Sequence, residues 1–195
     1  MAKSPSERRM HARSVGARRA EQQAEQLLHR LGVEKAPVPV EHLALRLGLQ
    51  VERTELGDDV SGVLVVEDRR GVIGISVTEA PVRQRFSVAH EIGHFILHRA
   101  QLSVFIDKQF FKPYYAAFRD ARSSAGTEKR EREANAFAAA LLMPAHLVRD
   151  AIADLRMDVA DEDALDALAS RFEVSRQAMS FRVAKLAIFE GQPSR

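Results

Sequence analysis

The chain has 195 residues, of which 46% are hydrophobic and 29% charged, and its formal net charge is +2. This balance is typical of a soluble globular protein with a buried core and excludes a wholly disordered chain. No stretch approaches the roughly 18 consecutive apolar residues of a membrane helix, and the N-terminus lacks an apolar signal segment, so we expect a cytosolic protein with no membrane partner. Cysteine is absent, so any metal must be held by nitrogen and oxygen ligands.

The positive charge is concentrated at the N-terminus. Residues 1–30 carry seven Lys or Arg against three Glu, a local charge of +4. Such a segment can contact nucleic acid or an acidic partner, but a solvated, partly helical or disordered leader is the commoner case. We therefore expect residues 1–20 to form a flexible basic leader without a function of its own.

Two helices and a hairpin are expected to follow. Residues 21–31 have apolar side chains at helical spacing, and a second apolar helix is predicted near residues 40–47 after a Pro-rich break. Residues 50–66 and 72–77 have strand-like composition and predict a small antiparallel sheet. This hairpin could offer an edge strand along which an extended peptide binds as an added strand.

The next segment, from Pro81 to about His98, is apolar on nearly every face and predicts a buried helix. It contains His90, Glu91 and His94 in a H-E-x-x-H pattern. Residues four apart lie about 40° apart around a helix axis, so both imidazoles can bind one ion. Glu91 is placed to take a proton from a water molecule that attacks a carbonyl. Two core histidines without a metal are the alternative, but burying these three polar groups without a shared purpose would be costly.

A catalytic zinc needs a third protein ligand and an open position. Residues 128–143 show a helical pattern, and Glu131 falls roughly 50° from the centre of its apolar stripe, whereas Glu128 and Glu133 fall roughly 110° away. Glu131 is therefore the expected third ligand. Asn135, one turn later, could accept a hydrogen bond from a ligand imidazole, and a plain packing role is equally compatible.

Other groups could assist the reaction. His98 lies one turn beyond His94 and could approach the metal or stabilise the oxyanion, although a hydrogen-bonded core or rim histidine is the commoner case. Residues 101–127 hold half of the aromatic side chains and end in a turn-rich stretch, which fits a mobile cleft lining or cap but equally a satellite core on an ordinary loop. The hydroxyl of Tyr114 or Tyr115 could donate to the oxyanion.

Residues 151–195 are expected to form a C-terminal helical extension. They read as helix, turn, helix, with Ser175 as the N-cap of the second helix. The spacing is similar to a DNA-reading helix-turn-helix, whose second helix would carry Arg176, Gln177, Ser180 and Arg182. The acidic run at residues 158–166 would repel phosphates, which favours packing or protein recognition over DNA contact.

Two motifs in this order resemble the ImmA/IrrE metallopeptidases: residues 85–94, and residues 131–138 followed by 141–144. The resemblance covers roughly residues 22–150. It implies a mainly helical α+β, zincin-like domain at residues 21–150. It also implies one Zn²⁺ per chain on His90, His94 and Glu131, with Glu91 as general base.

The resemblance also implies a function, because this family cleaves or otherwise disables helix-turn-helix repressors in bacteria and their mobile elements, often under stress. We therefore expect a zinc endopeptidase that hydrolyses such a repressor and so derepresses stress or mobile-element genes. A non-hydrolytic antirepressor and a DNA-binding regulator acting through the C-terminal helices are the alternatives. The presence of Glu91 favours hydrolysis, because a binding-only protein needs no general base.

Overall fold

The computed structural model describes residues 5–56, 60–67, 70–99, 104–108, 124–155 and 162–190. Its elements in chain order are α1 (Pro5–Leu31), α2 (Val40–Arg46), β1 (Leu49–Thr54), β2 (Val60–Glu67), β3 (Arg70–Ser76), α3 (Pro81–His98), β4 (Val104–Lys108), α4 (Ser124–Leu142), α5 (Ala145–Leu155), α6 (Glu162–Phe172) and α7 (Arg176–Glu190). The chain is thus mainly helical α+β, as predicted.

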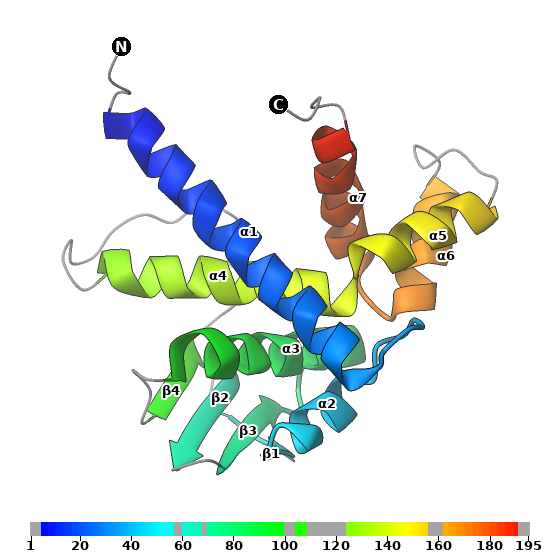
Figure 1. The fold of residues 1–195 in the computed structure, drawn as a ribbon. Helices are drawn as coiled ribbons and strands as arrows, with labels where there is room; N and C mark the ends of the chain where they lie inside the picture. Colours follow the sequence, from blue (N-terminus) through cyan, green and yellow to red (C-terminus); the bar gives the residue numbers. More distant parts are fainter. Residues whose placement is uncertain are drawn as a thin grey trace.

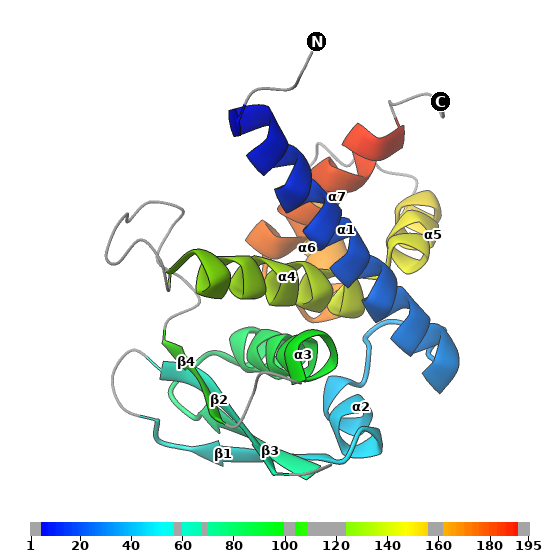
Figure 2. The same cartoon turned by 60° about the vertical axis from the view of Figure 1, so that its left-hand side comes forward.

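The elements are stacked in layers (Figures 1 and 2). The sheet forms the base, α3 packs on β2 and β3, α4 packs on α3, and α1 crosses over α4. The C-terminal helices α5, α6 and α7 gather at the end of α4 that is remote from β4 (Figure 1). This order leaves α3 between the sheet and α4, so the H-E-x-x-H pattern on α3 lies at the centre of the fold.

The sheet is mixed, with strand order β1-β3-β2-β4, so the expectation of a purely antiparallel sheet is wrong. The predicted β2–β3 hairpin is present, but β1 pairs with β3 in parallel. Gly71 leaves room for this pairing, because a Cβ there would lie 2.8 Å from Leu49 Cδ2. The hairpin also offers no free edge: β3 lies between β1 and β2, and β2 lies between β3 and β4.

The core is built largely on α4, which packs against α1 and α3. Its predicted inward stripe is fully buried and comprises Ala134, Phe137, Ala138, Leu141 and Leu142. Burying each large apolar side chain contributes about 1.5–3 kcal/mol. Among the described residues no single helix is long and apolar enough to cross a membrane, and only the bent pair of residues 126–142 and Ala145–Leu155 has the length and composition.

Three expected boundaries can be placed on the observed helices. Helix α1 runs unbroken from Pro5, so residue 20 lies inside it, and residue 150 lies inside α5. Helix α4 begins at Ser124, within the stretch expected to be a turn. The contact of α1 with α4 accounts for the first difference: Gly16 lies against Glu133, whose Oε1 would be 2.5 Å from a Cβ at that position.

Candidate metal centre

Helix α3 buries the three residues of the H-E-x-x-H pattern completely. His90, Glu91 and His94 are each 0% exposed. Proline at N1 starts this helix after Ala80, and one-turn spacing then places both histidines on the same side. The two Nε2 atoms are 2.7 Å apart, and the rings meet edge to face with centroids 4.4 Å apart. Both imidazoles therefore direct a ring nitrogen at one point.

Helix α4 brings the carboxylate of Glu131 to that point. Its Oε2 lies 3.4 Å from His90 Nε2, and its Oε1 lies 3.5 Å from His94 Nε2. The ligand atoms of all three residues lie within 4.8 Å of one another, and they form the only such group of three or more His, Asp or Glu among the described residues. The predicted ligand set is therefore brought together.

Gly93 allows the two helices to come this close. A Cβ on Gly93 would lie 3.2 Å from the Cα and the carbonyl oxygen of Ala134, and 3.2 Å from Phe137 Cδ1. These distances are shorter than ordinary van der Waals contact. A larger residue at position 93 would therefore push α4, and Glu131 with it, away from the histidines.

The environment sets the ionisation that a metal requires. Burial lowers the pKa of His90 to about 3, against an opposing contribution from Glu131. Burial would raise the pKa of Glu131, but hydrogen bonds with His90 and His94 outweigh it and lower that pKa to about 2. At neutral pH His90 is thus neutral and Glu131 is an anion, which is the state in which both can act as ligands.

The donor set fits a divalent metal such as zinc. Two imidazole nitrogens and one carboxylate oxygen are the ligands of many catalytic zinc sites, which keep a fourth position open. Two ring nitrogens 2.7 Å apart are close enough to bind one ion, and regular tetrahedral zinc coordination would separate them to about 3.3 Å. The side chain of Glu131 is 28% exposed, so a substrate can approach the cluster from the side on which Glu131 lies.

Glu91 lies beside this cluster but is not part of the ligand group. Gly62 of β2 faces it: a Cβ on Gly62 would lie 3.2 Å from Glu91 Oε1. The sheet therefore approaches the carboxylate through its backbone. Sequence reasoning missed Gly62, and the only signal was a glycine within a valine-rich strand, which commonly marks a close approach.

The remaining candidates have separate positions. Asn135 lies on α4 beside His90, whose pKa its side chain raises slightly. His98 is 8% exposed, its ring centroid is 5.6 Å from that of His94, and its Nε2 is 3.7 Å from Glu133 Oε2. Burial, followed by the proximity of His94, lowers the pKa of His98. Tyr114 and Tyr115 lie outside the described residues.

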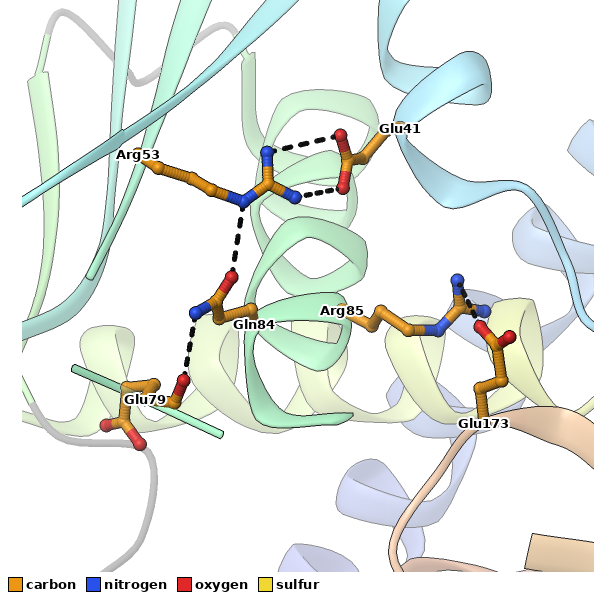
Figure 3. A network of polar contacts seen from close by, with 6 residues as sticks. All are labelled: Glu41, Arg53, Glu79, Gln84, Arg85 and Glu173. Atoms are coloured by element: carbon orange, nitrogen blue, oxygen red, sulfur yellow. Dashed lines mark hydrogen bonds and ion pairs between the residues drawn. The ribbon is translucent and has the colours of Figure 1, made fainter. Parts of the chain in front are cut away.

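Polar contacts anchor the first turns of α3 to its surroundings (Figure 3). Arg53 of β1 donates from Nε to Gln84 Oε1 at 3.2 Å and also pairs with Glu41 of α2. Arg85 pairs with Glu173, in the turn before α7, at 3.1 Å. Helix α3, which carries both histidines, is thus held by the sheet and by the turn that precedes α7.

The C-terminal helices are held by ion pairs. Ser175 caps α7 as predicted, because its Oγ accepts a hydrogen bond from Ala178 N at 3.1 Å. Arg176 pairs with Asp166 and Glu162 of α6, contacts that raise its pKa. Arg182 is 3% exposed and donates to Met143 O at 2.9 Å and to Glu21 Oε2 at 2.9 Å.

Two histidines of a H-E-x-x-H helix and a glutamate from a second helix form a ligand set of the kind that metallopeptidases use. The chain belongs to the Peptidase_M78 family, the IrrE N-terminal-like domain, whose profile matches residues 44–184. No curated protein matches it. A solved structure, a Mycobacterium tuberculosis transcriptional regulator, shares the fold with a TM-score of 0.58 at 20% identity. The match covers 86% of this chain but only 46% of that one.

Proposed function

We propose that the chain is a zinc-dependent endopeptidase that acts on a cytosolic protein. The observation that supports this most directly is the convergence of His90, His94 and Glu131 beside the buried carboxylate of Glu91. Helix α3 alone provides two ligands and the base, and α4 provides the third ligand. A purely structural zinc site would have a closed set of four ligands and no need of Glu91.

In this mechanism the peptide bond is hydrolysed without a covalent enzyme intermediate. A bound zinc ion would act as a Lewis acid on water and on the scissile carbonyl. Glu91 takes a proton from the attacking water as its oxygen bonds to the carbonyl carbon, and returns it to the amide nitrogen as the C–N bond breaks. Asn135, whose side chain interacts with His90, would orient that imidazole.

We further propose that the substrate is a helix-turn-helix transcriptional repressor. The resemblance to the ImmA/IrrE metallopeptidases supports this target. The similar structure named as a transcriptional regulator is compatible with a regulatory setting. Cleavage of a repressor would release stress or mobile-element genes from repression.

Two alternatives are less well supported. Direct DNA binding through α7 would need free cations, but Arg176 is paired with carboxylates and Arg182 is buried in contacts with Glu21 and Met143. A non-hydrolytic antirepressor would leave the fully buried Glu91 without a role that offsets the cost of burying it.

The decisive experiment compares new protein N-termini in cells that express wild type, Glu91→Gln or Glu128→Gln, with and without DNA damage. Glu128 is a matched control, because its side chain on α4 is 61% exposed. We expect a terminus inside a repressor in wild type and in the control but not in Glu91→Gln. Relief of repression by a zinc-loaded Glu91→Gln protein, with no new terminus in any sample, would instead establish an antirepressor.

A further inference from the structure

A pocket of about 260 Å³ lies between the first turns of α3 and the start of α7. Its walls include Val82, Arg83, Phe86 and Ser87 of α3, and Val174 and Ala178 at the start of α7. Most of these side chains are apolar. None of the lining residues is acidic.

The pocket lies one turn of α3 before the candidate metal centre. His90 lies one turn after Phe86 and about 40° round the helix axis from it, about 6 Å farther along. Arg83, Phe86 and His90 therefore lie on one side of α3.

The sheet links the pocket to Glu91 as well. Arg83, on the pocket wall, donates from Nη2 to Ser61 Oγ at 3.3 Å. The next residue of β2 is Gly62, which faces the Glu91 carboxylate. A peptide whose carbonyl lies at the metal centre could therefore place a neighbouring side chain in this pocket.

Resting on the proposed peptidase function, we propose that this pocket binds an apolar side chain next to the scissile bond and so selects the substrate. Its volume is sufficient for a leucine or phenylalanine side chain, and its apolar walls would gain by removing such a group from water. A lysine or arginine would be disfavoured. Arg83, which is paired with Glu79 at 3.1 Å, lines the pocket. The N-termini of α3 and α7, which carry partial positive charge, also open onto it.

The test uses the zinc-loaded Glu91→Gln protein, which holds peptides without cleaving them. Blocked hexapeptides that differ only in one central residue, Leu, Ala or Lys, are titrated while the amide NMR signals of Gln177 and Ala178 are followed. We expect the Leu peptide to bind at least about tenfold more tightly than the other two, and to shift those signals. Equal affinities, or shifts confined to other parts of the protein, would overturn the proposal.

A pair of variants on α7 tests whether the apolar side chain binds in this pocket. Ala178→Trp fills the pocket and should remove the preference for Leu. Ala184→Trp makes the same change at an exposed position outside the pocket and should retain it. If both variants keep the preference, another surface selects the side chain, and the proposal is wrong. Free hexanol is titrated as a further probe. If the amide signals of Gln177 and Ala178 shift with hexanol but with none of the peptides, the pocket is a small-molecule site and the proposal is wrong.

Cleavage of the same peptides by the zinc-loaded wild type separates this proposal from the peptidase function. Selective binding without cleavage would retain the pocket and count against the endopeptidase. Cleavage at equal rates for Leu, Ala and Lys would retain the endopeptidase and refute the pocket.

Discussion

Replacing Gly93 by alanine tests whether the approach of α4 to α3 sets the metal centre. The new Cβ would lie 3.2 Å from two backbone atoms of Ala134, so α4 must retreat by a few tenths of an ångström. Overpacking of this kind costs about 1–3 kcal/mol. Replacing a helical glycine by alanine returns about 0.5–1 kcal/mol through helix propensity. The net change in the free energy of unfolding should therefore range from nearly zero to a loss of about 2.5 kcal/mol.

Gly126→Ala is the matched control, because Gly126 also lies in a helix but a Cβ there would have no neighbouring atom within 4 Å. It should gain about 0.5–1 kcal/mol. The two variants should thus differ by about 1–3 kcal/mol in urea unfolding of the metal-free protein. A shift of Glu131 beyond the roughly 0.2 Å that coordination tolerates should also weaken zinc binding about tenfold in Gly93→Ala alone, measured by chelator competition. Equal stabilisation of both variants with unchanged zinc affinity would refute the reasoning.

Three further predictions concern the same centre. Glu131→Gln should weaken zinc binding by more than about tenfold, because an amide replaces the anionic ligand; chelator competition against Glu128→Gln measures the loss, and equal affinities would exclude Glu131 as a ligand. Gly62→Ala should lower kcat in a peptide-cleavage assay while zinc affinity stays unchanged, because the new Cβ displaces the Glu91 carboxylate and not the ligands; unchanged kcat would contradict this. The metal-free protein should lose stability as the pH falls from 6.5 towards 3, because unfolded His90 takes up a proton that the folded state resists. Urea unfolding at pH 7 and pH 5 tests the sign, and a protein more stable at pH 5 would contradict it.

The metal centre was predictable because its signal is local. His90 and His94 share one helix, and the angular position of Glu131 on its own helix distinguishes it from its acidic neighbours. The same argument did not predict the contacts of Glu133, because it assumed that α4 has a single buried face. Because α4 lies between α1 and α3, Glu133 also faces packed surfaces and contacts both Gly16 and His98.

The sheet was only partly predictable. The β2–β3 hairpin follows from two adjacent strands and a short turn, but the parallel pairing of β1 with β3 joins strands that are not consecutive in the chain. Composition carries no information about such an order. The proximity of Gly62 to Glu91 is likewise a consequence of how the sheet packs on α3: the glycine in the strand indicates a close approach, but not which residue approaches.

The contact of Arg182 with Glu21 spans 161 positions of the chain, which has a consequence for synthesis. At about 5–20 residues per second, Glu21 would be added to the chain roughly 8–32 s before Arg182. Until Arg182 has been made, neither Glu21 nor the carbonyl of Met143 can meet the guanidinium that both contact in the finished fold. Completion of this corner is therefore a late event in the synthesis of this segment, and a nascent chain that stops short of α7 would leave it open.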